Sequence, residues 1–185
     1  MNRETAIENA IMGAPKKIGF ADAVVIRNVR VHLAAGRVDL MLLPKPGRIK
    51  LVLVEAKATG ATDAASKVIG QLLMYYAGAL KLGTKGLALM RRFAEAHPDR
   101  ACSTSTTSPK AMTGGVTPPS EAWQRLEAGR RLRPSEIALF IAVDSKPRAS
   151  LTDALNALRK HHRLPIGIIR VDGGIPSTVD IEAEA

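Results

Sequence analysis

The residues best suited to chemistry are two carboxylates and one ammonium group in the middle of the chain: Asp39, Glu55 and Lys57. Glu55 and Lys57 are two residues apart near the end of an apolar run, so in a strand they point to the same face. Two carboxylates and a main-chain carbonyl suit a hard, oxygen-preferring ion such as Mg²⁺, which keeps several waters. A lysine beside such an ion could polarise an attacking water or stabilise charge on a phosphate.

The strands that would position these residues are predicted at 37–43 and 48–57. Pro44-Lys45-Pro46-Gly47 joins them, and we expect a hairpin because the prolines fix φ and the glycine permits positive φ. Folding about this turn places Asp39 opposite about Leu53 and one diagonal step from Glu55, within reach of long side chains. The structural alternative is an ordinary ion pair between Glu55 and Lys57 at a solvated strand end.

A helix is predicted from about Thr62 to Leu80, with an apolar stripe at three- and four-residue spacings. The residues of this stripe are Ala65, Val68, Leu72, Tyr76 and Ala79. Gln71 and Tyr75 share one side of the helix, with Lys67 a turn earlier. This polar stripe flanks the apolar one, so we expect it to face the rim of the sheet where the carboxylates end.

The remaining elements predict a single α/β domain. We expect a first helix carrying Ile7 and Ile11, and strands at 22–33 (bent near Asn28) and 86–91. After these come a strand at 137–144, a helix at 151–161 and a last strand at 165–171. In the segment 101–120, 14 of 20 residues are Ser, Thr, Pro or Gly, which predicts a mobile insertion. The order is therefore α-β-β-β-α-β over residues 1–91, the insertion, and a β-α-β part over 136–172.

In this order, three segments resemble the motifs of the PD-(D/E)xK nuclease superfamily. They are Gly36-Arg37-Val38-Asp39-Leu40, Val54-Glu55-Ala56-Lys57 and Gln71-Leu72-Leu73-Met74-Tyr75. The last segment is similar to the Gln-x-x-x-Tyr element of the RecB-like branch. The resemblance implies a restriction-endonuclease-like core, in which helices flank a mixed central sheet.

The resemblance also implies a role for each matching residue. Asp39, Glu55 and the carbonyl of Ala56 would bind Mg²⁺, for which Mn²⁺ would substitute. Lys57 would be the catalytic lysine, and Gln71 and Tyr75 would brace the site or touch the substrate backbone. Some members of the superfamily carry a glutamate from the first helix, and Glu8 is the candidate for that position in this chain.

The composition indicates which binding partners and which cellular compartment to expect for the protein. Lys and Arg number 27 against 17 Asp and Glu, and the resulting charge of +10 favours a polyanionic partner such as nucleic acid. The basic residues expected to contact phosphate, rather than only confer solubility, are Lys67, Arg91, Arg92, Arg130 and Arg131.

The single cysteine, Cys102, excludes an intramolecular disulfide, a cysteine-rich zinc site and a protein-ligated iron–sulfur cluster. With neither a membrane-length apolar run nor an apolar signal core, we expect a cytoplasmic protein that does not bind membranes and is compatible with a homodimer.

The leading hypothesis is a magnesium-dependent deoxyribonuclease that recognises ends, single strands or branches. No separate module for reading base sequence is evident, and phosphate contacts carry no sequence information. Within the enzyme class, the alternative is a structure-specific endonuclease similar to Holliday-junction resolvases. Outside it, the alternatives are a non-catalytic nucleic-acid-binding protein on the same fold and a small interaction domain whose basic surface has no specific ligand.

Overall fold

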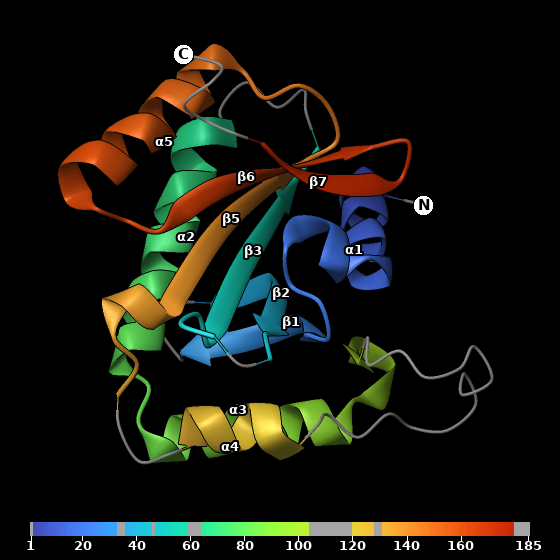
Figure 1. Ribbon diagram of the computed structural model, residues 1–185, viewed down its shortest axis with the longest axis vertical. Helices are drawn as coiled ribbons and strands as arrows, with labels where there is room; N and C mark the ends of the chain where they lie inside the picture. The colour runs from blue at the N-terminus through green and yellow to red at the C-terminus, as the bar shows by residue number, and fades with distance from the viewer. Residues whose placement is uncertain are drawn as a thin grey trace.

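The computed structural model describes residues 2–32, 36–45, 47–58, 64–103, 120–127 and 131–179 (Figure 1). The helices are α1 (Arg3–Gly13), α2 (Ala64–Lys81), α3 (Thr84–Ala96), α4 (Ser120–Glu127) and α5 (Ala149–His162), with short 3-10 helices η1 (Pro15–Ile18), η2 (Pro98–Arg100) and η3 (Pro134–Glu136). The strands are β1 (Val24–His32), β2 (Gly36–Leu43), β3 (Leu51–Lys57), β4 (Ala101–Ser103), β5 (Ile137–Val143), β6 (Ile166–Asp172) and β7 (Ile175–Val179). None of the helices in these ranges is long and apolar enough to cross a membrane.

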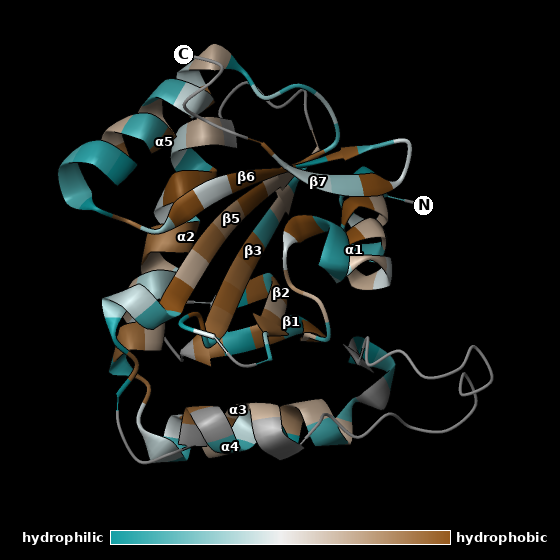
Figure 2. Cartoon of the chain, viewed as in Figure 1, coloured by the Kyte–Doolittle hydropathy of each residue, from teal (hydrophilic) through white to brown (hydrophobic). Residues whose placement is uncertain are grey.

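The strands form one mixed sheet in the order β4-β1-β2-β3-β5-β6-β7. Strands β3, β5 and β6 run parallel to one another, and the other neighbours pair antiparallel. The prediction of an α/β domain with helices around a mixed sheet is thereby confirmed. The three parallel strands are apolar over most of their length (Figure 2), as expected for strands covered on both faces.

Two apolar cores lie on opposite faces of the sheet. On one face, α2, α3 and α5 pack on the strands through buried residues that include Leu72, Leu87 and Leu155. On the other face, α1 and η1 cover the strands through Ile7, Ile11 and Ile18. Because α1 and α2 lie on opposite faces of β3, polar side chains from both helices can reach the end of that strand (Figure 1).

The strand expected at 86–91 is wrong, because this segment lies within helix α3. Its buried residues Leu87, Met90 and Ala94 follow the helical period, whereas Leu89 is 64% exposed. A short apolar run is compatible with either period, and here the flanking residues extend the helical one. The strand that pairs in parallel with β3 is β5, so the α-β-β-β-α-β order expected within residues 1–91 is completed only by residues 137–143.

The connection between β2 and β3 is longer than the predicted four-residue turn. Strand β3 begins at Leu51 instead of residue 48, and the N–H of Lys50 donates to the carbonyl of Glu136 before β5, at 2.8 Å. Residues 48–50 therefore belong to the connection. The β2–β3 register pairs Leu40 with Val54, which sets Asp39 level with Glu55 instead of one diagonal step away.

Two further boundaries differ from the sequence prediction. Of the insertion expected at 101–120, Ala101–Ser103 form strand β4 beside β1, where Cys102 pairs with Val25, and Ser120 begins α4. Residues 104–119 lie outside the described residues. The C-terminal β-α-β part gains strand β7, which follows β6 through Gly173 and Gly174, both with positive φ. Glycine adopts such angles without steric cost, so these two residues permit the tight turn.

Candidate active site

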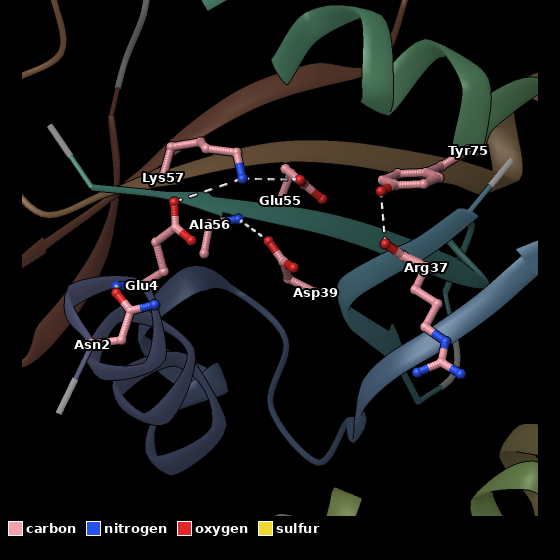
Figure 3. Close-up of polar contacts among 8 residues, drawn as sticks. All are labelled: Asn2, Glu4, Arg37, Asp39, Glu55, Ala56, Lys57 and Tyr75. Carbon is pink, nitrogen blue, oxygen red and sulfur yellow. Dashed lines mark hydrogen bonds and ion pairs between the residues drawn. The ribbon is translucent and has the colours of Figure 1, made fainter. Parts of the chain in front are cut away.

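Asp39 and Glu55 are brought together where β2 and β3 separate. The paired register ends at Leu40 and Val54, and beyond it the Asp39 carboxylate replaces a main-chain acceptor. Its Oδ2 atom accepts a hydrogen bond from the N–H of Ala56 at 2.8 Å (Figure 3). This hydrogen bond holds the Asp39 side chain of β2 beside Glu55 of β3, as the motif spacing predicts.

Lys57 links the sheet to helix α1. Its Nζ atom lies 3.2 Å from Oε1 of Glu55 and 3.7 Å from Oε1 of Glu4 (Figure 3). The lysine side chain is 24% exposed, whereas that of Glu55 is only 3% exposed. The ammonium group therefore lies at the opening of the site and Glu55 at its base.

Helix α1 is attached to the sheet by ion pairs near the site. Arg3 contacts Asp144, the residue after β5, at 2.7 Å. Arg27 on β1 contacts Oε2 of Glu8 at 3.0 Å and donates a hydrogen bond to Oδ1 of Asn9 at 2.5 Å. These contacts hold the helix in the position from which Glu4 reaches Lys57.

The structure distinguishes the two glutamates of α1. Glu8, the sequence candidate, is paired with Arg27. Burial raises the pKa of Glu8, Arg27 opposes that rise, and the nearby Asp39 carboxylate adds to it. Glu4 contacts Lys57 directly and was not singled out from the sequence. The spacing contained a signal, because residues four apart share one face of a helix, but periodicity alone could not decide which glutamate would reach the lysine.

Electrostatics in the site favour a bound cation. Burial, and then repulsion from Asp39, raise the pKa of Glu55 to about 7, although Lys57 acts to lower it. Burial likewise raises the pKa of Asp39, despite the opposing Ala56 N–H and Lys57. The half-buried Asp39 and the buried Glu55 hold their protons more tightly than ordinary carboxyl groups, and a cation between them would favour the charged form of both.

The pKa of Lys57 is also raised, but for a lysine this shift favours the charged form. Burial alone would lower its pKa, but the carboxylates of Glu55, Asp39 and Glu4 outweigh burial and raise it. Lys57 therefore remains an ammonium ion at neutral pH. It can donate hydrogen bonds, but it cannot act as a proton acceptor there.

The donor set of the site fits a hard metal ion. Oε2 of Glu55 is buried and makes no hydrogen bond within the described residues. A buried acceptor of this kind costs free energy unless something binds it. Among the described residues, no three His, Cys, Asp or Glu side chains are grouped to hold a metal, so the ligands would be two carboxylates, the Ala56 carbonyl and waters. Mg²⁺ is commonly bound by such a set.

Helix α2 places Gln71 and Tyr75 against the same part of the sheet. The Tyr75 hydroxyl donates to the Arg37 carbonyl at 2.6 Å (Figure 3). Burial, then the charges of Glu55 and Asp39, raise the pKa of Tyr75, which keeps it protonated. Contrary to the predicted stripe, Tyr75 is more deeply buried than Tyr76, because it packs under β2. The Oε1 atom of Gln71 is buried without a hydrogen-bond partner in the described part of the chain.

The predicted phosphate-contacting residues do not form one cluster. Lys67 is exposed near the start of α2, but Arg91 and Arg92 lie on α3, beyond the other end of α2. Arg91 is also paired with Glu95 at 2.8 Å. Arg131 is exposed before η3, and Arg130 lies outside the described residues.

Comparisons of the chain with protein-family models, curated proteins and solved structures give no match.

Proposed function

We propose that this protein is a magnesium-dependent deoxyribonuclease that hydrolyses phosphodiester bonds at ends, single strands or branches. The observation that carries the proposal is the convergence of Asp39, Glu55 and Lys57 at one end of β3, with a buried Glu55 oxygen lacking a partner. The chain order α1-β1-β2-β3-α2, completed by β5 parallel to β3, supports a restriction-endonuclease-like core. Gln71 and Tyr75 beside the site favour the RecB-like branch.

The proposed metal ligands are the carboxylates of Asp39 and Glu55 and the carbonyl oxygen of Ala56. When bound, Mg²⁺ supplies Lewis-acid chemistry, which lowers the pKa of water and offsets phosphate charge. The hydrogen bond from the Ala56 N–H orients Asp39, and burial excludes water from most of Glu55. Glu4 and Glu55 hold the Lys57 ammonium at the opening, where it can donate to a phosphate oxygen or to a water.

Lys57→Ala should lower turnover about 100-fold or more while changing DNA affinity less than about threefold. One ammonium among 27 basic residues contributes little to phosphate attraction, whereas a donor placed at the reacting group acts in the transition state. The measurement is single-turnover cleavage at saturating DNA, alongside equilibrium binding in Ca²⁺. A collapse of affinity with unchanged turnover would instead make Lys57 a binding residue.

The substrate class is tested with four DNAs of equal nucleotide concentration: linear duplex, closed circular duplex, single-stranded and branched. We expect progressive loss of linear or single-stranded DNA with Mg²⁺ or Mn²⁺, and no loss with EDTA. Discrete sequence-defined fragments from the circle would contradict a structure- or end-directed nuclease. Selective cutting of the branched DNA would favour the junction-resolving alternative, and salt-dependent binding without cleavage would favour the non-catalytic one.

A further inference from the structure

Asn28 has an unusual backbone conformation inside strand β1. Its φ angle is +51°, and it is the single non-glycine residue with positive φ within the described strands. The other two such residues, Asp22 and Arg163, lie in a turn and after a helix. The left-handed region is sterically unfavourable for an L-residue, and asparagine tolerates it better than most.

The strand register places Asn28 opposite Asp39. Arg27 pairs with Leu40 on one side of Asn28, and Val29 pairs with Val38 on the other. No residue is gained or lost between these pairs, so the position facing Asn28 is Asp39. The left-handed residue and the proposed metal ligand therefore share one level of the sheet.

At this level of the sheet, the alternation of core-facing residues also shifts by one position in both β1 and β2. A strand with strict alternation exposes every second residue to one face. On β1 the residues that belong to the core under α2 are Val24, Ile26, Val29 and Val31, and on β2 they are Val38, Met41 and Leu43. The interval of three residues in each strand spans Asn28 and Asp39. Because the two changes coincide, the register survives and apolar residues on both sides of the break stay buried.

We propose that Asn28 is a positioning residue, whose left-handed backbone sets the Asp39 carboxylate in the orientation that accepts the Ala56 N–H. If β1 continued in extended conformation, β2 would keep strict alternation past Asp39. In that register, Ala56 falls opposite Val38, whose main chain would then compete for the N–H that Asp39 accepts. The left-handed conformation of Asn28 releases β2 from that pairing. The Ala56 N–H is then left free to donate to the Asp39 carboxylate. This inference rests on the proposed function for its catalytic consequence, but its structural part is independent of it.

Two substitutions separate the backbone from the side chain of Asn28. Asn28→Gly removes the carboxamide and keeps positive φ accessible, whereas Asn28→Val opposes positive φ because valine is β-branched. The matched control is Asp22→Val, which places the same strain in a turn away from the site. If Asn28→Val does not fold, Asn28→Ala replaces it with the same expectations.

The first readout is the amide proton shift of Ala56 in metal-free protein, with Asp39→Asn as the reference for the lost carboxylate bond. The second is the rise in Tm caused by Mg²⁺, and the third is turnover at saturating DNA. We expect Asn28→Gly and Asp22→Val to match the wild type in all three, with turnover within about twofold. We expect Asn28→Val to move the Ala56 shift towards the reference and to lower Mg²⁺ affinity and turnover by about tenfold or more, as for other residues that orient metal ligands.

Two results would overturn the inference. One is a folded Asn28→Val with the wild-type Ala56 shift. The other is an Asn28→Gly that is as impaired as Asn28→Val, since the carboxamide and not the backbone would then matter. If the wild type neither responds to Mg²⁺ nor cleaves DNA, the proposed function fails, while the Ala56 shift still decides the role of Asn28.

Discussion

Asp39→Asn and Glu55→Gln should each abolish DNA cleavage, with rates at least about 1,000-fold below the wild type. Each substitution keeps the size of the side chain and removes one negative charge from the proposed metal ligands. A metal ion contributes several kcal/mol to transition-state stabilisation, and each 1.4 kcal/mol corresponds to a factor of ten. The rates are measured in single turnover with Mg²⁺ on the substrate that the wild type prefers.

The control for this experiment is Asp153→Asn, which makes the same chemical change on the exposed side of α5. It should cleave at the wild-type rate. Both site variants should remain folded and bind DNA, because most of the basic surface is unchanged. Cleavage by both purified site variants at wild-type rates would contradict the assignment of the site.

In metal-free protein, Glu55 should make stability depend on pH. Its folded pKa of about 7 is above the unfolded value of 4.5. The stability associated with the protonated carboxyl is fully present below pH 4.5 and is lost as the pH rises through about 7. The free-energy difference is on the order of a few kcal/mol, which corresponds to a change of about 5 °C or more in Tm for a chain of this size.

The measurement is Tm at pH 5 and pH 8 for the wild type and Glu55→Gln, in EDTA and in Mg²⁺. From pH 5 to pH 8 in EDTA, the wild type should lose about 5 °C relative to the variant. Mg²⁺ at pH 8 should recover this loss in the wild type, since a ligand that binds only the folded state stabilises it, but not in Glu55→Gln. Parallel profiles of Tm against pH for the two proteins would show that folding does not raise the pKa of Glu55.

The site was predictable from the sequence to the extent that it depends on local geometry. Residues 55 and 57 share a face in any strand, and a turn at 44–47 must bring Asp39 back beside them. The register between β2 and β3 was not predictable, because the start of β3 depends on a long-range contact. The N–H of Lys50 donates to the carbonyl of Glu136, a residue 86 positions later in the chain. The contact between Glu4 and Lys57 likewise depends on how α1 is attached to β1 and to the end of β5.

The fold was predictable where the apolar period is unambiguous. The first helix and the three following strands are confirmed, and the bend expected near Asn28 coincides with its positive φ. The segment 86–91 was predicted wrongly because a short apolar run is compatible with either a strand or a helix, and its packing on β1 as part of α3 favours the helix. Strand β7 was missed because five residues beside an acidic tail give a weak pattern, although two adjacent glycines marked the turn.

The parallel pairing of β3 with β5 has a consequence for the order in which the molecule assembles. Every residue of the proposed motifs precedes position 76, but the strand that covers the outer edge of β3 begins at Ile137, paired with Leu51. Strands β1, β2 and β3 are neighbours in the chain and can pair early, whereas closing the 86-residue separation to β5 carries a larger entropic cost. During synthesis, the motif residues would therefore leave the ribosome well before their environment exists. The burial that raises the pKa of Glu55, and with it the preference for a cation, would arise only when β5 has paired with β3.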